Sequence, residues 1–342
     1  MAAILRNAVE HADNFRPEND KTLYQFRVFD VAYPVGFIRE VFMTAQFPAA
    51  FKVDKANRIV LLAPQLKGRT HVQAADEAFI EFCEKNTGLC KGFAPWLAKT
   101  PDKRDWHAIF GLDSPLADLR VATPARGIFG VATAGCHCNV YSTKVVGGKE
   151  VIETIWLSKR SSTATFPLAP DQMAAGAMDP SDQMQPMIAF KRELQEEADM
   201  IIAADGKTIT YKGKKCGEIR GGVQTISIAT LKGPIAGPKE DGHLEFALRY
   251  SIDICLSPGF NPNPNAEDTD VGSFHPIKVA NLAKDAFSKP WKYSSGAVMV
   301  DWVLRHNLMP VTDAQKKELL ARLHYRIPFK NVQKYLSGDT SS

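Results

Sequence analysis

The chain has 342 residues, which is long for one domain and comfortable for two. Its apolar fraction of 45% and charged fraction of 23% are those of an ordinary globular protein. The net charge of +4 is too small to indicate nucleic acid as the main partner, so we expect none, although a few local lysines and arginines suffice to bind an anionic small molecule.

The first 20 residues predict a short helix followed by a polar linker. They contain early acidic residues and no long apolar core, which argues against a signal peptide. No segment of the chain reaches the roughly 18–20 consecutive apolar residues needed to span a bilayer. We therefore expect no membrane contact and a cytoplasmic location.

Residues 24–62 alternate short apolar runs with turns. Strands are predicted at 35–38 and 59–62, with a helix candidate near 38–46 between them. Helical spacing of apolar residues follows over 70–88. Residues 1–122 are therefore predicted to form a separate N-terminal α/β domain.

A different pattern begins near residue 125. Apolar alternation over 138–142 and 151–157, on either side of a Gly-Gly pair, predicts a β-hairpin. Cys136 and Cys138 lie in the same alternating stretch, and one intervening residue, His137, is too few for the usual zinc knuckle. We interpret all three as strand residues. The six cysteines are sparse and irregularly spaced, which favours a reducing compartment over a disulfide framework.

Residues 185–198 predict a helix that follows a loop containing proline and glycine. Glu193, Glu196 and Glu197 fall on one arc of about 100° of this helix. Like charges at this spacing destabilise an isolated helix. A hard cation such as Mg²⁺, which takes oxygen ligands and commonly bridges to substrate phosphates, would compensate them. The pattern alone leaves open a solvated acidic helix face.

Further strands are predicted at 209–211, 223–231 and 246–256, and helices at 280–286, 296–306 and 313–324. The order of hairpin, loop, carboxylate helix, strands and terminal helices predicts a mixed α+β layout, with helices packed on a sheet.

The acidic helix also carries a resemblance to a known family. Residues 192–197 (RELQEE) match the second half of the Nudix box, whose pattern is G-x5-E-x7-R-E-U-x-E-E-x-G-U with U aliphatic. The flanking segments 35–38 (VGFI), 126–137 (RGIFGVATAGCH), 155–161 (IWLSKRS) and 289–306 are similar to segments of the thiamine-pyrophosphokinase-related Nudix hydrolases of fungi and plants. That branch carries its own N-terminal domain, and the resemblance spans about residues 30–325.

The first half of the box departs from the family pattern. Methionines stand at positions 178 and 184, where the family has a glycine and a glutamate. Asp199 and Met200 follow Ala198, where the family has a glycine. The residues that hold metal in the family are therefore present, whereas those that shape the loop are replaced.

The resemblance implies a Nudix-type mixed sheet sandwiched by helices over residues 123–330, with the C-terminal helices included. An N-terminal α/β accessory domain over 1–122 would precede it, and a polar tail over 331–342 would follow. It further implies hydrolysis of a diphosphate bond in a small organic diphosphate, with Mg²⁺ as the metal and Mn²⁺ as the alternative. The branch suggests thiamine diphosphate or an oxidised derivative as the substrate class.

The same resemblance assigns roles to residues. Glu193, Glu196 and Glu197 would be the metal ligands. Arg192 would orient Glu196 or a neighbouring carboxylate through charge-assisted hydrogen bonds. The general base that activates water would be Glu197 or Asp270.

A second group of candidates would bind the substrate. Lys159 and Arg160 would clamp its phosphates, unless they are a solvated pair that closes a strand. Trp156 would stack on an aromatic ring of the substrate, unless it packs in the core or on a sheet face.

Two other functions fit the same residues. A Nudix-fold isomerase acting on a prenyl diphosphate would need an acid–base Cys–Glu pair, for which Cys136 and Cys138 are the available thiols. A diphosphate-binding module with weak or no turnover would fit the replacements at Met178 and Met184. The sequence does not indicate an oligomeric state.

Overall fold

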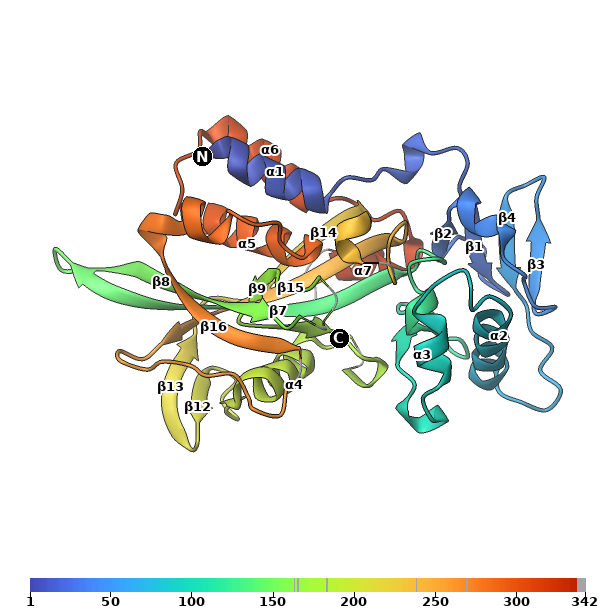
Figure 1. Cartoon of the computed structure of the whole chain (residues 1–342), viewed down its shortest axis with the longest axis horizontal. Helices are drawn as coiled ribbons and strands as arrows, with labels where there is room; N and C mark the ends of the chain where they lie inside the picture. Colours follow the sequence, from blue (N-terminus) through green and yellow to red (C-terminus); the bar gives the residue numbers. More distant parts are fainter. Residues whose placement is uncertain (163, 165, 183, 238, 269, 337–342) are drawn as a thin grey trace.

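The computed structural model describes residues 1–162, 164, 166–182, 184–237, 239–268 and 270–336. A large mixed sheet and a smaller sheet lie side by side along the long axis of the molecule (Figure 1). The smaller sheet is built from the N-terminal part of the chain, and the large sheet from residues that follow it.

Within the described residues, ten strands form the large sheet. The main path runs β11, β12, β13, β15, β7, β8 and β16, while β14, β10 and β9 pair with β15, β7 and β8 respectively. The strands are β7 (Ala132–Val146), β8 (Lys149–Arg160), β9 (Pro170–Gln172), β10 (Ala174–Ala177), β11 (Met200–Ile202), β12 (Thr208–Tyr211), β13 (Lys214–Ile219), β14 (Gln224–Leu231), β15 (Leu244–Leu256) and β16 (Val271–Lys278). The central pair β15 and β7 is parallel, with Phe246 opposite Ala132, and β15 is buried along its whole length.

Helices cover both faces of the large sheet (Figure 1). Helices α1 (Ala2–Ala12), α5 (Tyr293–Arg305) and α6 (Asp313–Leu323) lie on one face, and α4 (Pro186–Ala198) lies on the other. Each face has its own apolar core. Beyond α6, a short helix, α7 (Gln333–Leu336), closes the described part of the chain. The predicted mixed α+β fold, with helices packed on a sheet, is confirmed.

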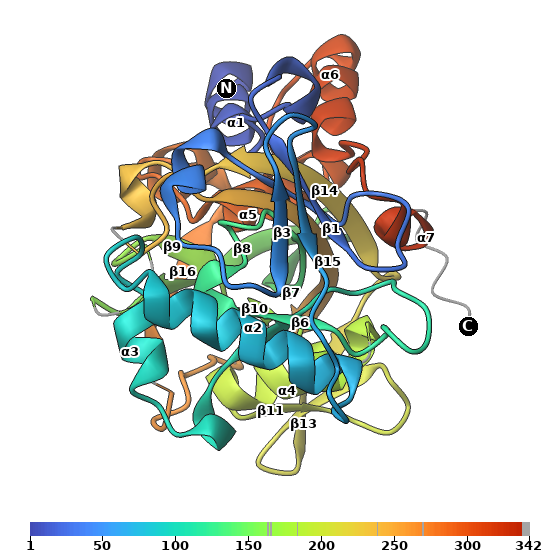
Figure 2. The same ribbon diagram turned by 90° about the vertical axis from the view of Figure 1, so that its right-hand side faces the viewer.

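The small sheet has the strand order β2 (Gly36–Ile38), β1 (Tyr24–Val28), β4 (Ile59–Leu62) and β3 (Phe51–Asp54). Figure 2 views the molecule from this side, with α2 (His71–Lys85) and α3 (Phe93–Leu97) in the foreground. Thr70 and Gln73 form a capping box that begins α2. A short ribbon of β5 (Trp106–Ala108) and β6 (Arg120–Ala122) leads from this part toward the large sheet.

Two glycines bring the segments around β2 and before β7 into backbone contact. A Cβ at Gly36 would lie 2.3 Å from the carbonyl oxygen of Phe129, and one at Gly130 would lie 2.1 Å from that of Phe37. Gly130 also has a φ of 55°, in the left-handed region that favours glycine. The backbones of the VGFI segment (35–38) and the GIFGV segment (127–131) therefore pack directly against each other.

The local elements follow the sequence patterns closely. The predicted hairpin is β7 and β8, which meet at Gly147 and Gly148. The predicted acidic helix is α4, and the helix predicted over 70–88 is α2. The candidate helix near 38–46 is a shorter 3₁₀ turn over Glu40–Thr44, and the helix expected over 280–286 is a 3₁₀ turn followed by a π turn.

The N-terminal helix packs on the large-sheet part of the molecule. Leu5 and Val9 of α1 are buried in the core that contains α5 and α6. Conversely, Phe129 packs among the aromatic rings under the small sheet. The division after residue 122 remains a prediction, and of the predicted tail over 331–342, residues 337–342 lie outside the described residues.

None of the helices in the described ranges combines the length and the apolar character needed to cross a membrane.

Candidate functional site

Helix α4 turns two of its three carboxylates inward. The helix begins with Pro186 and ends at Asp199, whose φ of 54° is left-handed. Glu193 and Glu197, one helical turn apart, are each only 7% exposed. The side chain of Glu196 is 56% exposed. The arc that holds all three carboxylates therefore runs from the buried side of the helix to solvent.

Arg192 connects the carboxylates with the preceding loop. Its guanidinium donates to Glu193 at 2.7 Å and to Glu196 at 3.2 Å. It also donates to Asp182 at 2.9 Å and to the carbonyl oxygen of Ala177 at 2.9 Å. One cation thus fixes α4 against β10 and the loop that begins the helix.

The two inward carboxylates have unusual protonation equilibria. Burial raises the pKa of Glu193 to about 7, against the opposing charge of Arg192. Burial, followed by the charge of Glu193, raises the pKa of Glu197 well above its usual range. The backbone N–H of Ala175 donates to Glu197 at 2.9 Å. Two buried carboxylates that repel one another are an arrangement that a bound cation would relieve.

The donor chemistry of this pair fits Mg²⁺. Carboxylate oxygens are its preferred protein ligands, and Mg²⁺ usually keeps several waters and binds through only one or two carboxylates plus substrate phosphates. Within the residues that the structure describes, no cluster of three or more His, Cys, Asp or Glu side chains is gathered tightly enough to hold a metal alone. Water and phosphate oxygens would therefore complete the coordination.

Gly176 places these carboxylates beside a cavity. A Cβ at Gly176 would lie 1.9 Å from Oε1 of Glu193, so only glycine leaves room for this carboxylate. Gly176 and Ala177 also line a cavity of about 580 Å³, a size typical of small-molecule sites. Part of the lining comes from residues 92–126, which we call the N-terminal wall, and part from residues 133–294, which we call the sheet wall.

Arg160 and Lys292 bring positive charge to the sheet wall. Both lie against the buried carboxylate of Asp171, at 3.2 and 3.3 Å respectively. Burial opposes ionisation of Asp171, yet Lys292 and Arg160 hold its pKa below the usual range. Arg160 also lies 3.5 Å from Asp270, whose side chain is 61% exposed and which also lines the cavity.

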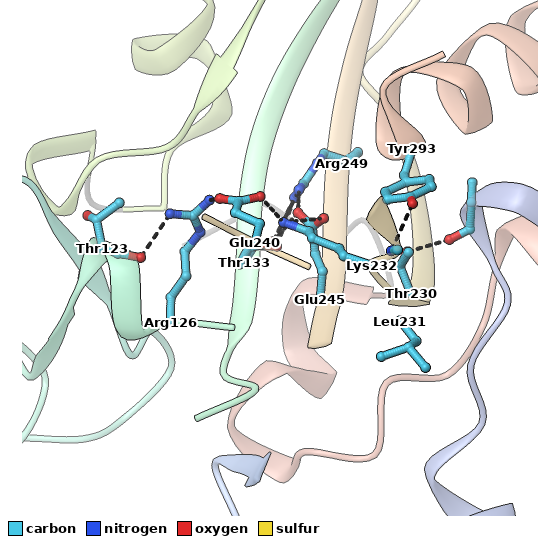
Figure 3. A network of polar contacts seen from close by, with 12 residues as sticks. Thr123, Arg126, Thr133, Thr230, Leu231, Lys232, Glu240, Glu245, Arg249 and Tyr293 are labelled. Atoms are coloured by element: carbon cyan, nitrogen blue, oxygen red, sulfur yellow. Dashed lines mark hydrogen bonds and ion pairs between the residues drawn. The ribbon is translucent and has the colours of Figure 1, made fainter. Parts of the chain in front are cut away.

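A chain of buried and half-buried charges connects the two walls (Figure 3). Arg126 of the N-terminal wall pairs with Glu240, which lies 2.7 Å from Lys232. Lys232 lies 3.2 Å from Glu245, which pairs with Arg249. All five residues line the cavity. We call this series the charge network.

The structure separates the residues predicted from the sequence into two groups. Arg160 and Asp270 lie at the cavity, and Arg192, Glu193, Glu196 and Glu197 lie on the helix next to its Gly176 border. Lys159 and Trp156, on β8, are not among the described residues that line the cavity. Trp156 packs against the core of the large sheet, and its indole N–H hydrogen-bonds none of the described residues. The phosphate contact of Lys159 and the ring stacking of Trp156 therefore remain predictions without geometric support.

Sequence reasoning missed several residues of the site. Lys292 lies within the segment 289–306, which resembles the family but has no local pattern that predicts a phosphate contact. Asp182, the buried partner of Arg192, lies just before the helix. Acidic residues are favourable near the N-terminus of a helix, so its position in the sequence could have predicted a role there. The charge network has no local signature at Arg126, because this residue lies more than a hundred positions before the other four members in the chain.

Comparison with known proteins adds distant likenesses. No family model matches the chain. An uncharacterized protein of Saccharomyces cerevisiae is 28% identical over 217 residues, which cover 62% of this chain and 58% of the yeast protein, less than two thirds of its length.

Similar solved structures include a MutT Nudix hydrolase from Burkholderia pseudomallei (16% identity, TM-score 0.30, covering 50% of this chain and 98% of that one). The Nudix domain of Shewanella oneidensis NrtR in complex with ADP ribose is 10% identical, with a TM-score of 0.32, and the match covers 53% of this chain and 91% of that one. A C. elegans Ap4A hydrolase is 15% identical, with a TM-score of 0.28, and the match covers 50% of this chain and 96% of that one.

Proposed function

We propose that the protein is a Mg²⁺-dependent hydrolase of the Nudix type, which cleaves a diphosphate bond in a small organic diphosphate. The observation that carries the proposal is the buried pair Glu193 and Glu197, set behind Gly176 at the border of a cavity with Arg160 and Lys292 in its wall. A cation-binding pair next to fixed positive charge is what diphosphate chemistry requires, since phosphates repel an attacking water.

Each residue then has a role. Glu193 and Glu197 would hold Mg²⁺, with Glu196 adjacent, and the ion would neutralise charge on the diphosphate. Arg160 and Lys292 would bind the phosphate oxygens. Asp270 reaches the cavity as an exposed carboxylate beside Arg160, and it and Glu197 are the candidates for positioning or deprotonating the water. Mn²⁺ would serve in place of Mg²⁺, because it also takes carboxylate and water ligands.

The geometry gives less support to an isomerase. Cys136 and Cys138 are fully buried in β7 and are not among the described residues of the cavity wall. Burial, with the charge of Glu193 or Glu197 next, raises the pKa of both thiols well above the usual range. A thiol in this position is poorly suited to transfer protons to a ligand in the cavity.

Within the class of organic diphosphates, we propose thiamine diphosphate or an oxidised derivative as the substrate, on the basis of the sequence resemblance. The cavity volume suits a ligand of this size.

Release of phosphate from a panel of diphosphates tests the proposal. The panel contains thiamine diphosphate, its oxidised derivative, ADP and a prenyl diphosphate, each with Mg²⁺, with Mn²⁺ and with EDTA. We expect release from at least one ring-bearing diphosphate, abolished by EDTA. Tight binding without release from any compound would identify a binding module instead, and rearrangement of the prenyl diphosphate without phosphate release would identify an isomerase.

A further inference from the structure

The charge network holds more positive than negative charge in the wall of the cavity. Its cations are Arg126, Lys232 and Arg249, and its anions are Glu240 and Glu245. Lys232 and Arg249 are only 5% and 7% exposed. Buried charge is costly unless an opposite charge accompanies it, and one positive charge of this network has no counterpart within it.

The cations of the network also have more N–H donors than their partners use. An arginine has five donors and a lysine has three. Arg126 donates to the carbonyl oxygen of Thr123 at 2.9 Å and to Glu240, and these bonds are the ones that it makes to the described residues. Lys232 lies 2.7 Å from Glu240 and 3.2 Å from Glu245. Both cations therefore keep donors for an acceptor that the described protein does not supply.

Arg249 is fixed by its terminal nitrogens. They donate to Thr133, to the carbonyl oxygen of Leu248 and to Glu245. Among the described residues, none accepts from its Nε–H. The guanidinium is thus held in one orientation by protein groups, and a donor is left over, as in a preorganised anion site.

The network begins next to the proposed metal carboxylates. Arg249 of β15 is the register partner of Gly135 on β7, and a Cβ at Gly135 would lie 3.5 Å from Nε of Arg249. The same Cβ would lie 2.8 Å from the carbonyl oxygen of Gly176, the glycine that makes room for Glu193. From there the network runs to Arg126 on the N-terminal wall (Figure 3). Positive charge therefore extends from the border of the metal pair across the cavity.

The cavity has a second basic group, which is built on a different acid. Arg160 and Lys292 lie against Asp171, whereas the cations of the network lie on Glu240 and Glu245. A phosphate or carboxylate would supply both the negative charge and the acceptor oxygens that the network lacks.

We propose that the charge network is a second anion-binding site of the cavity, which holds a phosphate or carboxylate group in addition to the diphosphate at Arg160 and Lys292. The inference rests on the proposed function only for the position of the diphosphate. The second anion is either an acidic group on the organic part of the substrate or a free anion such as released phosphate.

Equilibrium dialysis against radiolabelled inorganic phosphate in EDTA counts the anions bound to each chain. The wild-type protein is expected to bind two. Lys292→Met should remove the phosphate at Asp171 and leave the one at the charge network, since Arg160 still accompanies the buried acid.

Two substitutions in the network should change its phosphate affinity in opposite directions. Arg126→Gln removes a cation and should weaken binding at least about threefold, whereas Glu240→Gln removes an anion and should strengthen it at least about threefold. Damage to the fold would weaken binding in both variants. The matched controls are Arg305→Gln and Asp301→Asn, which alter an ion pair of similar burial outside the described cavity lining and should leave phosphate binding unchanged.

The source of the second anion is found by repeating the dialysis with saturating ADP or adenosine 3′-phosphate 5′-diphosphate. A phosphate that stays bound beside ADP but is displaced by the second compound would assign the site to an acidic group of the substrate. One that stays bound beside both would assign it to a free anion.

Either of two results would overturn the inference: a single phosphate per wild-type chain that is lost in Lys292→Met, or changes of affinity in the same direction in Arg126→Gln and Glu240→Gln. The dialysis needs neither metal nor turnover, so it is independent of the phosphate-release assay. Two bound phosphates without hydrolysis of any diphosphate would leave the inference standing and remove the hydrolase, whereas hydrolysis by a protein with one phosphate site would do the reverse.

Discussion

The carboxylates of Glu193 and Glu197 are buried together, and the guanidinium of Arg192 bonds directly to the first of them. Such a pair weakens the metal-free fold, because burial favours the protonated acids. Retaining buried acids at a cavity border, at a cost in stability, is typical of a functional site. Their role can therefore be separated experimentally from a structural one.

Glu197→Gln and Glu196→Gln are each expected to reduce turnover at least about a hundredfold, the scale of losing a key charge-stabilising group. Glu197→Gln should leave the melting temperature of the metal-free protein unchanged or higher, because a neutral amide avoids the cost that burial places on an ionised carboxylate at this position. Phosphate release and thermal unfolding measure the two effects. The control is Glu84→Gln, an exposed carboxylate on α2. Full activity in both site variants would contradict the assignment.

Three buried histidines, His107, His137 and His243, make the protein acid-sensitive. Burial lowers the pKa of each to about 3. The unfolded chain binds protons at these sites below about pH 6.5, whereas the folded protein does not until near pH 3. The contribution of each histidine to the free energy of unfolding is therefore largest above pH 6.5 and falls as the pH drops toward 3, by up to about 1.4 kcal/mol per pH unit. The raised pKa values of Glu193 and Glu197 contribute in the opposite direction, because these acids bind protons more readily in the folded protein.

Urea unfolding at a series of pH values between 7 and 4 measures this slope. His243→Leu should make it shallower by the contribution of one histidine. The same dependence on pH in His243→Leu and in the wild type would show that the His243 imidazole titrates normally in the folded protein.

At the scale of elements, the contact between α4 and β10 sets the geometry of the site. Gly176 of β10 pairs with Cys136 of β7, and its missing side chain leaves space for the carboxylate of Glu193. Arg192 adds a hydrogen bond to the end of the same strand. The position of a proposed metal-binding carboxylate thus depends on a strand that carries none of the acidic residues.

Gly176→Ala is expected to displace the Glu193 carboxylate. Because the clashing group is the end of a flexible side chain, the loss of stability should be small, about 1 kcal/mol, while turnover falls at least about tenfold. Gly222→Ala is the control, since a Cβ there would meet nothing within 4 Å. Equal turnover in the two variants would show that the position of Glu193 is unimportant.

At the scale of the whole molecule, the first helix and two late helices lie together over one face of the large sheet. Helix α1 packs on α5 and α6, and Arg6 and Arg322 bond across this contact to Glu318 and Glu10. The cavity is likewise shared, with one wall from residues 92–126 and the other from the sheet. Both features join parts of the chain that the predicted division after residue 122 would place in separate domains.

Leu5→Ala tests how far α1 supports the large-sheet part. Leu5 is fully buried, so its truncation should lower the free energy of unfolding by about 2–5 kcal/mol. Asn7→Ala, at an exposed position of the same helix, should change it by less than about 0.5 kcal/mol. Denaturant unfolding gives both values. Similar free energies of unfolding in the two variants would mean that the packing of α1 contributes little to the stability of the fold.

The sequence by itself determined the local elements and one half of the site. Helical spacing placed the three glutamates on α4, and alternation around Gly147 and Gly148 predicted the hairpin of β7 and β8. These predictions were possible because helices and strands repeat with a short period, which appears as a regular spacing of apolar residues within a few positions of the chain. The same reasoning included Trp156 and Lys159 in the site, since order along a strand does not tell which side chains reach a cavity.

Only the tertiary structure decided which residues meet. It turned Glu196 outward, brought Lys292 and Asp171 to Arg160, and set His107 of the N-terminal wall near the charge network. Such contacts join residues far apart in the chain, and they follow from the packing of all the elements together. No local sequence pattern predicts these contacts, because they depend on the free energy of the whole folded structure.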